Sequence, residues 1–328
     1  MHDRWNEIDA AACSSPLELR AYSSRLLGLD PALVLHGGGN TSVKTRVPNL
    51  FGEVEDILYV KGSGWDLATI AAAGFAPVRL EVLRRMAGLT ALTDSDMVHA
   101  QRAAMIDPNA PTPSIEAILH AIIPFDFVDH THADAVVTVS NTSDGERRIR
   151  RIYGDDVLVL PYVMPGFALA RLVRQQTMTT DWSRLQGIVL LHHGIFSFGP
   201  DAHTSYERMI ALVRRAEQHL DQHGALAAPA RQQLTSPLDQ DALLSLARLR
   251  HVVGTTRGGP MVARLDRSPD AVGFASRSDA PAIATRGPLT PDHVIRTKPV
   301  PLVADGDWVD TVAGFAERYR EYFARHAT

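Results

Sequence analysis

Two histidines stand two residues apart in the segment from Asp129 to Asp134, which reads Asp-His-Thr-His-Ala-Asp. The apolar run before them predicts a β-strand, and side chains at positions i and i+2 of a strand point to the same face. His130 and His132 can therefore present both imidazoles to one divalent cation. The same pair would also fit a solvent-facing strand end, so a third ligand is needed to decide between the two interpretations.

A second pair, His192 and His193, follows the apolar run 188–191 and precedes Gly194. An open catalytic zinc site uses three protein ligands and keeps a fourth position free, so one more histidine completes the predicted set. Because side chains alternate along a strand, His192 and His193 face opposite ways. The pattern leaves open which of the two is the ligand.

The segment 111–116 reads Pro-Thr-Pro-Ser-Ile-Glu and precedes an apolar helical pattern. Ser114 is a residue type that caps helix N-termini, and Glu116 falls in the first turn, where exposed amides favour a carboxylate. Capping alone accounts for both residues. The functional alternative is that Ser114 and the first amides bind an anion while Glu116 acts as a general acid or base beside the metal.

Two glycine-rich turns follow short apolar runs: residues 36–42, His-Gly-Gly-Gly-Asn-Thr-Ser, and residues 61–64, Lys-Gly-Ser-Gly. Glycines let backbone amides close around a phosphate or a carboxylate. Neither turn has the spacing of a Walker loop or of a dinucleotide-binding loop. Together with the helix start at Ser114, they give three segments able to bind an anion in a chain that also offers a metal site.

Helices and strands alternate in the part of the chain that carries these motifs. Helical periodicity predicts helices at residues 16–27, 77–86, 95–106, 114–122, 167–175 and 203–219. Short runs rich in Val, Ile and Leu predict strands at residues 32–36, 57–60, 127–131, 157–160 and 188–192. This alternation favours a layered α/β domain over an all-helical one.

The character of the chain changes after about Leu226, through a segment rich in Ala, Pro, Gln and Ser. We therefore expect a boundary near Thr235, with a catalytic domain over residues 1–235 and a C-terminal extension over residues 236–328. Helices are predicted at residues 239–250 and 309–325. No residue of the extension is predicted to take part in chemistry.

The composition narrows the classes of function and partner. The formal charge of −4 comes from 33 basic and 37 acidic residues, which are interspersed and give no basic surface for nucleic acid. No apolar run approaches the roughly 20 residues of a membrane helix. Cys13 is the single cysteine, and the N-terminus lacks an apolar signal core, so we expect a cytoplasmic protein without an internal disulfide.

In their order along the chain, five of these motifs resemble the class II aldolase/adducin family. Their residues are Gly39, Asn40 and Ser42; Gly62, Ser63 and Gly64; Pro113, Ser114 and Glu116; His130 and His132; and His192, His193 and Gly194. The resemblance runs from about Leu17 to Leu220 and is closest to the aldolase part of bifunctional rhamnulose-1-phosphate aldolase/dehydrogenase proteins. The segment 290–303 also resembles the end of that aldolase part.

The resemblance implies a three-layer α/β/α domain with a central, mostly antiparallel sheet, followed by a C-terminal extension. It implies that His130, His132 and His193 bind Zn²⁺, or alternatively Mn²⁺ or Co²⁺, which selects His193 over His192. It assigns to Glu116 the transfer of the proton at the nucleophilic carbon, while the metal chelates the enediolate. A divalent cation stabilises such developing negative charge.

The family's phosphate-binding groups map onto Gly39, Asn40, Ser42, Ser63, Gly64 and Ser114. Tyr162 matches a tyrosine that donates a proton to the aldehyde oxygen, often across a subunit interface, although packing beside Pro161 is an equal alternative. The family also implies a homotetramer. In one departure from the family, Lys-Gly-Ser-Gly stands where Thr-Pro-Ser-Gly is common, so the anion bound there could differ from a phosphate monoester.

The implied function is metal-dependent cleavage of a ketose 1-phosphate, or a related ketose, to dihydroxyacetone (phosphate) and an aldehyde. On the same fold, sugar-phosphate 4-epimerases tend to carry aspartate where Glu116 stands, and a 3-oxo-acid phosphate decarboxylase is chemically close. Lys61 offers a Schiff-base mechanism of a different class. Adducin-like scaffolding proteins lack the histidines, so His130, His132 and His193 argue against that class.

Overall fold

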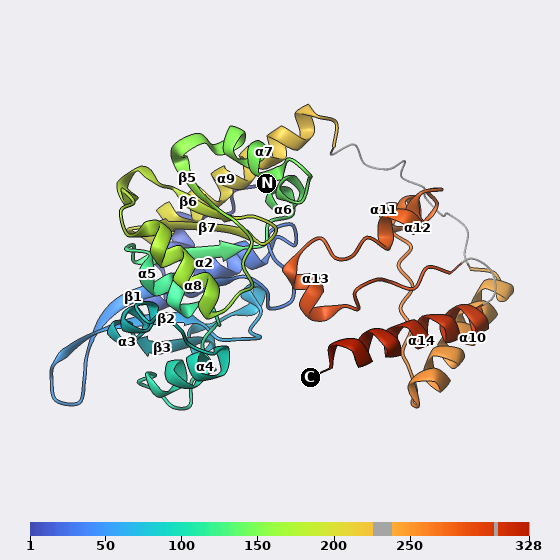
Figure 1. Cartoon of the computed structure of the whole chain (residues 1–328), viewed down its shortest axis with the longest axis horizontal. Coiled ribbons are helices and arrows are strands. Elements are labelled where there is room, and N and C mark those ends of the chain that lie inside the picture. The colour runs from blue at the N-terminus through green and yellow to red at the C-terminus, as the bar shows by residue number, and fades with distance from the viewer. Residues whose placement is uncertain (226–237, 305–307, 328) are drawn as a thin grey trace. The chain divides into compact units, whose positions relative to one another are not determined.

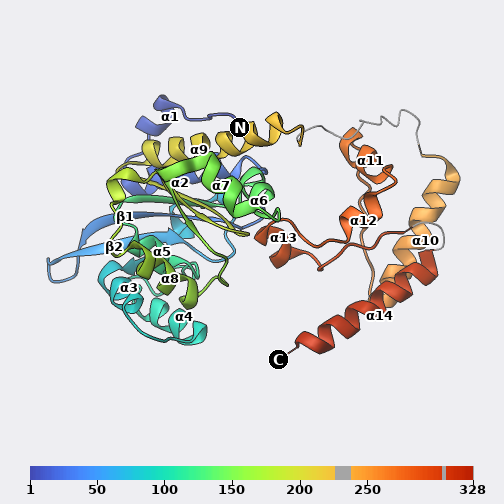
Figure 2. The same ribbon diagram turned by 45° about the horizontal axis from the view of Figure 1, so that its top comes forward.

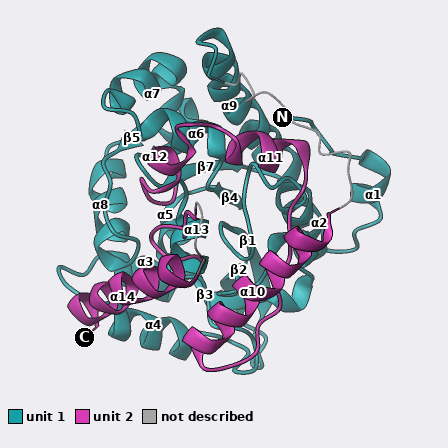
Figure 3. Cartoon of the chain, turned by 90° about the vertical axis from the view of Figure 1, so that its right-hand side faces the viewer, with its two compact units in different colours: residues 1–226, 289–296 teal, residues 227–288, 297–328 magenta. Residues whose placement is uncertain are grey.

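The computed structural model describes residues 1–225, 238–304 and 308–327. The chain divides into two compact units, drawn in two colours in Figure 3. Unit 1 comprises Met1–Leu226 together with Leu289–Arg296, and unit 2 comprises Ala227–Pro288 with Thr297–Thr328. The predicted boundary near Thr235 lies outside the described residues. The short segment 289–296, although late in the chain, belongs to unit 1.

Unit 1 is built on a seven-stranded sheet with the strand order β3-β2-β1-β4-β7-β6-β5 (Figure 1). The strands are β1 (Asn40–Pro48), β2 (Val54–Lys61), β3 (Phe75–Arg79), β4 (Phe127–Thr131), β5 (Val157–Leu160), β6 (Gly187–Leu190) and β7 (Gly194–Gly199). Every neighbouring pair is antiparallel except β5 and β6, which are parallel. The expected mostly antiparallel sheet is confirmed.

Helices cover both faces of this sheet (Figure 2). The helices of unit 1 are α1 (Glu7–Ala11), α2 (Pro16–Gly28), α3 (Leu80–Ala87), α4 (Asp94–Ala103), α5 (Ala117–Ile122), α6 (Asp134–Ser140), α7 (Gly145–Tyr153), α8 (Phe167–Thr177), α9 (Ala202–Gln222) and α13 (Pro291–Arg296). Val159 and Val189 join one buried core, with α2, α6, α7 and α9. Leu160 and Leu190 join the other, with α3, α5 and α8, as strand alternation requires. The three-layer α/β/α architecture is confirmed.

The sequence-based prediction is wrong for several local elements. Residues 32–36 form turns rather than a strand, with φ values of 43° at His36 and 87° at Gly37. The helix expected from Pro77 begins at Leu80, because residues 75–79 pair with β2 as the edge strand β3. A proline is tolerated on an edge strand, since the missing amide leaves no ladder bond unmade in the sheet interior. Strands β1 and β7 were not predicted.

A buried ion pair joins α2 to the central strand β4. The Nη2 of Arg20 lies 2.5 Å from Oδ1 of Asp129, and both side chains are 0% exposed. Ser205 of α9 donates to the other Asp129 oxygen at 2.5 Å. Because Asp129 and His130 are consecutive in β4, their side chains face opposite sides of the sheet. The ion pair therefore anchors the strand from the side away from His130.

Unit 2 is helical. Its helices are α10 (Gln240–Arg257), α11 (Pro269–Ala275), α12 (Ala280–Ala284) and α14 (Trp308–His326), and α10 packs against α14. The ammonium group of Lys298 lies 3.6 Å from the centre of the Tyr319 ring. Among the described residues, no helix combines the length and apolar character needed to cross a membrane.

Candidate metal centre

Three histidines from two separate parts of the sheet converge at one point. His130 belongs to β4, His132 lies one residue beyond the end of that strand, and His193 lies in the turn between β6 and β7. One ring nitrogen from each lies within 4.8 Å of the other two, and the side chains are buried, so the group could hold a metal ion. They meet because β7 pairs with β4, which brings the β6–β7 turn beside the end of β4.

The β6–β7 turn decides between the two neighbouring histidines. His192 has a φ of 60°, so the alternation of the strand breaks there, and its exposed ring bonds Asn141 at 2.8 Å. His193 points inward and is 3% exposed. Gly194 is needed beside it, because a Cβ there would lie 2.3 Å from the carbonyl oxygen of Thr131 and 3.1 Å from ring carbons of both other histidines.

Hydrogen bonds fix the ring orientations of His130, which lies in β4, and of His132, which directly follows that strand. His130 Nδ1 lies 3.1 Å from the carbonyl oxygen of Ile195, which can only accept, so Nδ1 carries the proton and Nε2 keeps a lone pair. His132 Nδ1 lies 2.6 Å from Oδ1 of Asp292, which leaves its Nε2 available in the same way. Burial lowers the pKa of His130 well below its ordinary value and that of His193 to about 4. At neutral pH these two rings are therefore uncharged, the form that binds metals.

Buried polar atoms without a hydrogen-bond partner gather at this centre. They include Nε2 of His130, Nδ1 of His193 and Oε1 of Glu116. A buried polar atom left unpaired is costly, and such atoms call for a water, an ion or a ligand. The residues present therefore fit a divalent cation with histidine ligands and a position to spare.

Glu116 lies beside the three rings. Its Oε2 is 3.4 Å from Nε2 of His130, and its Oε1 is 3.6 Å from Nε2 of His193. Asn40 donates to Oε2 at 2.7 Å. Burial alone would raise the pKa of Glu116, but the positive charge that the neighbouring histidines carry once protonated at low pH, together with the bond from Asn40, outweighs burial and lowers the pKa to about 2. The side chain makes no capping bond in α5, so capping does not account for its position.

A buried histidine that the sequence analysis missed orients this carboxylate through Asn40. His120 Nε2 lies 2.5 Å from Oδ1 of Asn40, and its Nδ1 lies 2.7 Å from the hydroxyl of Ser42. Burial lowers the pKa of His120 to about 3, so the ring is neutral and one nitrogen accepts while the other donates. The directions that satisfy every group run from Ser42 to His120, from His120 to Asn40, and from Asn40 to Glu116. The four-residue spacing of Glu116 and His120 was the available signal.

The three predicted anion-binding segments also lie together. The amide of Ser63 donates to the carbonyl of Thr112 at 2.8 Å, which pairs the 61–64 turn with the Pro-Thr-Pro-Ser segment. Lys61 Nζ donates to the carbonyl of Gly37 at 2.7 Å, and a Cβ on Gly37 would lie 3.0 Å from the carbonyl oxygen of Gly64. The 36–42 turn, the 61–64 turn and the helix start at Ser114 therefore form one neighbourhood.

Individual members of the predicted substrate site differ in exposure. Ser63 and Gly64 are exposed, whereas Gly39, Asn40 and Ser114 are buried. Ser42 is fully buried, with its hydroxyl against the His120 ring. Tyr162 follows β5 and is 49% exposed, and its hydroxyl lies 3.8 Å from Sδ of Met164. The substrate-binding and catalytic roles assigned to these residues stay predictions.

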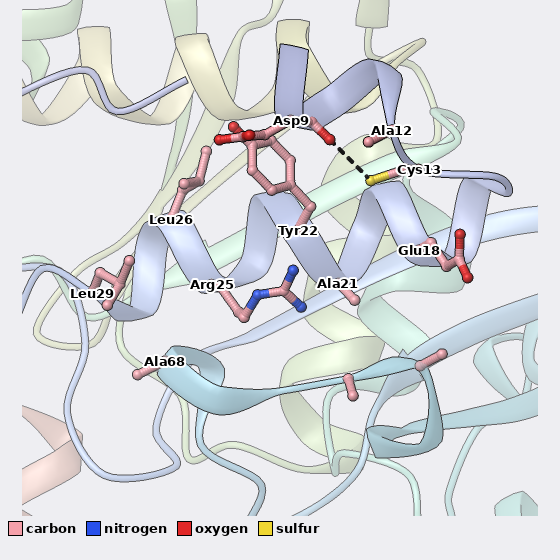
Figure 4. A pocket seen from close by; sticks show the side chains of 12 residues that line it. Asp9, Ala12, Cys13, Glu18, Ala21, Tyr22, Arg25, Leu26, Leu29 and Ala68 are labelled. Atoms are coloured by element: carbon pink, nitrogen blue, oxygen red, sulfur yellow. Dashed lines mark hydrogen bonds between the residues drawn. The ribbon is translucent and has the colours of Figure 1, made fainter. Parts of the chain in front are cut away.

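A pocket elsewhere in unit 1 is separate from this centre. It lies along α2 and is lined by residues that include Cys13, Tyr22 and Arg25, but by none of the three histidines (Figure 4). Cys13 donates to the carbonyl of Asp9 at 3.6 Å, and burial raises the pKa of its thiol. A thiol of raised pKa is a weak nucleophile, so this pocket shows no chemistry comparable to that of the histidine centre.

Comparison with known proteins identifies the family. Residues 18–220 match the family model described as the class II aldolase and adducin N-terminal domain, and residues 240–328 match the one described as the second domain of class II aldolases. The chain therefore belongs to the class II aldolase and adducin family. The three-histidine group and the family match together support an enzyme of this family.

Two relatives illustrate the extent of the match. A solved N-terminal class II aldolase domain of a conserved protein from Thermoplasma acidophilum is 40% identical, with a TM-score of 0.62, and the match covers 67% of this chain and 99% of that one. An uncharacterized oxidoreductase, YuxG, from Bacillus subtilis is 31% identical over 343 residues, which are 98% of this chain and 49% of the relative. The chain thus spans about half the length of that relative.

Proposed function

We propose that the chain is a divalent-metal-dependent aldolase, a carbon–carbon lyase that cleaves a ketose 1-phosphate or a related ketose. The observation that carries the proposal is the convergence of His130, His132 and His193, all buried, on one point with Glu116 alongside. The three imidazoles would hold the ion, most simply Zn²⁺, with Mn²⁺ and Co²⁺ as alternatives. When bound, the cation would supply Lewis acidity toward the oxygens of the substrate.

Glu116 would move the proton at the nucleophilic carbon. In the synthetic direction its carboxylate removes a proton from dihydroxyacetone (phosphate), and in the cleavage direction its acid form returns that proton to the same carbon after the bond to the aldehyde carbon has broken. Its Oε1 has no hydrogen-bond partner, whereas Oε2 is held by Asn40. The free oxygen is therefore the one we assign to proton transfer. Tyr162 is proposed to donate a proton to the aldehyde oxygen in the synthetic direction, and to accept the hydroxyl proton from that oxygen in the cleavage direction.

The anionic end of the substrate would bind at the neighbouring turns. Gly39, Asn40, Ser63, Gly64 and Ser114 belong to segments that lie together beside Glu116. Ser42 was also predicted there, but its hydroxyl is engaged by His120. Backbone amides of such turns bind phosphate or carboxylate groups. The product is then dihydroxyacetone or its phosphate, together with an aldehyde.

The proposal is tested by removing and restoring the metal. Chelator-treated protein should lose retro-aldol cleavage of ketose 1-phosphates such as rhamnulose and fuculose phosphate, and added Zn²⁺, Mn²⁺ or Co²⁺ should restore it, as read by aldehyde release. Undiminished turnover after verified metal removal would refute the metal mechanism. Borohydride with substrate should not trap a Schiff base on Lys61, whose buried amino group bonds the Gly37 carbonyl.

Two related reactions form the alternative outcomes of a substrate screen. A sugar-phosphate 4-epimerase would interconvert two pentulose phosphates without net aldehyde release, and a 3-oxo-acid phosphate decarboxylase would release carbon dioxide. We place the aldolase first because Glu116 stands where epimerases of this fold tend to carry aspartate. We further propose a cytoplasmic homotetramer whose partners are small sugar phosphates rather than nucleic acid or membrane.

A further inference from the structure

The residue that fixes the His132 ring comes from the last forty residues of the chain. Asp292 lies in α13, belongs to unit 1 and is 3% exposed. One carboxylate oxygen lies 2.6 Å from Nδ1 of His132, and the other accepts from the amide of Leu35 at 2.9 Å. Both oxygens of Asp292 therefore form hydrogen bonds with residues of the metal-centre region. These partners, His132 and Leu35, lie 160 and 257 residues before Asp292 in the sequence.

In the glycine-rich turn, the carboxylate of Asp292 occupies the space that a side chain at position 38 would fill. A Cβ on Gly38 would lie 1.5 Å from Oδ1 and 2.3 Å from Cγ of Asp292, so any side chain at position 38 excludes the acid. No left-handed φ is required at Gly38, in contrast to its neighbours Gly37 and Gly39, which have φ values of 87° and 55°. The absence of a side chain at position 38 is thus explained by the acid rather than by the backbone.

The segment that carries Asp292 is held on the same turn from its other end. Arg296 donates from Nε and Nη2 to the carbonyl of His36, at 3.1 Å and 2.7 Å. At the start of the segment, the carbonyl of Leu289 accepts from Asn141 at 3.2 Å. These contacts hold residues 289–296 beside His132 and the 36–42 turn. They add no further metal ligand, since Asp292 is not part of the metal-binding group found among the described residues.

We propose that Asp292 is a positioning residue of the metal centre, which orients His132 as a metal ligand and can reach it only because position 38 is glycine. The inference rests on the proposed metal site. A carboxylate that accepts from one ring nitrogen fixes the tautomer, aims the other nitrogen at the ion and strengthens it as a ligand. No chemistry is predicted for this part of the chain from its sequence.

The first test measures Zn²⁺ affinity of the full-length protein by competition with a chromophoric chelator. Asp292→Asn should bind Zn²⁺ about 10–100-fold more weakly, the range found when such outer partners are lost. Asparagine has one acceptor oxygen, so it can serve either His132 or Leu35 but not both. Asp30→Asn is the matched control, because Asp30 lies in the turn before the same loop and its carboxylate, within the part of the chain that the structure describes, accepts only from the Ala32 amide at 3.1 Å. It should leave the affinity unchanged.

The second test is a double-mutant cycle on Gly38 and Asp292. Gly38→Ala alone should weaken Zn²⁺ binding and change the visible absorption spectrum of the Co²⁺-loaded protein, because it expels the carboxylate. In the Asp292→Ala background, Gly38→Ala should add little, since the clash is gone. Circular dichroism and thermal unfolding of the metal-free proteins check that each variant folds.

Three results would overturn the inference: wild-type Zn²⁺ affinity in Asp292→Asn, full additivity of the Gly38 and Asp292 variants, or no Zn²⁺ binding by the wild-type protein. The affinity measurement does not depend on the reaction catalysed. A protein that binds Zn²⁺ as described but cleaves no ketose would contradict the proposed aldolase function and leave the role of Asp292 standing.

Discussion

The two oxygens of Glu116 have different surroundings. Oε2 accepts from Asn40 at 2.7 Å, while Oε1 has no hydrogen-bond partner although it is buried. A carboxylate held at one oxygen and open at the other is suited to proton transfer at a fixed position. His130 and His193, whose rings lie beside it, are neutral and keep lone pairs for a metal, so the proposed proton-transfer group and the proposed ligands are distinct residues.

Replacement of Glu116 separates these two roles. Glu116→Gln should retain its metal, because the three histidines remain, and should lose proton exchange at the nucleophilic carbon by about 10²–10⁴-fold, the usual contribution of a positioned acid or base. Deuterium exchange of dihydroxyacetone phosphate, followed by NMR, gives the rate, and metal analysis gives the occupancy. Exchange at the wild-type rate would mean that another group is the base.

The buried chain from Ser42 through His120 and Asn40 leads to a second prediction. His120→Phe keeps an aromatic ring at this position but leaves Oδ1 of Asn40 without its donor, so the amide is free to turn away from Glu116. We expect kcat to fall by about 10-fold or more, the effect of losing about 1.4 kcal/mol at the transition state, with little change in KM or metal content.

Ser42→Ala provides the comparison for this variant. Among the described residues its hydroxyl hydrogen-bonds only to Nδ1 of His120, on the side of the ring away from Asn40, so we expect a smaller decrease in kcat and an unchanged KM. A rise in KM that appeared with phosphorylated ketoses but not with free ketoses would instead support Ser42 as a phosphate ligand.

At the scale of elements, β4 connects stability to the metal centre. Asp129 and His130 are neighbours on this strand, one in the Arg20 ion pair and the other in the histidine group. On the adjacent strand β1, Asn40 pairs in register with His130, which brings its side chain to the same face. These two neighbouring strands therefore supply a proposed metal ligand, His130, and the group that holds Glu116.

Lys44, farther along β1, gives an element-scale prediction about pH. Its amino group donates to the carbonyls of Ile123 and Phe125 at the end of α5, and burial, aided by the charge of Arg84, lowers its pKa to about 7. Above pH 7 the native state holds a neutral amine while the unfolded chain still binds a proton, so stability rises with pH up to the unfolded pKa.

We therefore expect the difference in free energy of unfolding, wild type minus Lys44→Met, to increase between pH 7 and pH 9. The increase should be at most about 1.4 kcal/mol per pH unit. Equilibrium denaturation in urea at several pH values measures this difference. Below pH 6 the two proteins should show parallel pH dependence, which serves as the internal control. Parallel curves above pH 7 would mean that the native lysine stays charged.

At the scale of the whole molecule, one chain leaves apolar surface uncovered. Leu50 and Phe51, in the turn between β1 and β2, are 94% and 83% exposed. Adjacent large apolar side chains at such exposure are typical of surfaces that another molecule covers. The proposed homotetramer would cover them if this turn lies in a subunit interface.

Light scattering coupled to size-exclusion chromatography tests the assembly. The wild type should have four times the 35.8 kDa mass of one chain. Phe51→Asp should shift the distribution toward smaller species, because a charge in a buried interface is costly. A wild-type mass of one chain would contradict the tetramer, and a Phe51→Asp tetramer would exclude this turn from the interface.

Local patterns in the sequence were enough to predict several features. Strand β4 was predicted with its observed bounds, as was β5, and helices α2, α4, α8 and α9 were predicted within a few residues. The same-face rule for His130 and His132 depends only on the period of a strand, so it needed no knowledge of the fold. The mostly antiparallel sheet came from the resemblance to the family, and the structure confirms it.

The tertiary structure alone decided the contacts that no local period encodes. The resemblance to the family had selected His193 over His192, but the physical reason for its inward position is the turn at His192. The partner of His132 comes from position 292, beyond the reach of any motif spacing. Hydrophobic periodicity predicts which face of a helix or strand is buried, but it does not predict which distant segment of the chain packs against that face. Convergence of ligands requires strand pairing across the sheet, and pairing is a property of the folded chain.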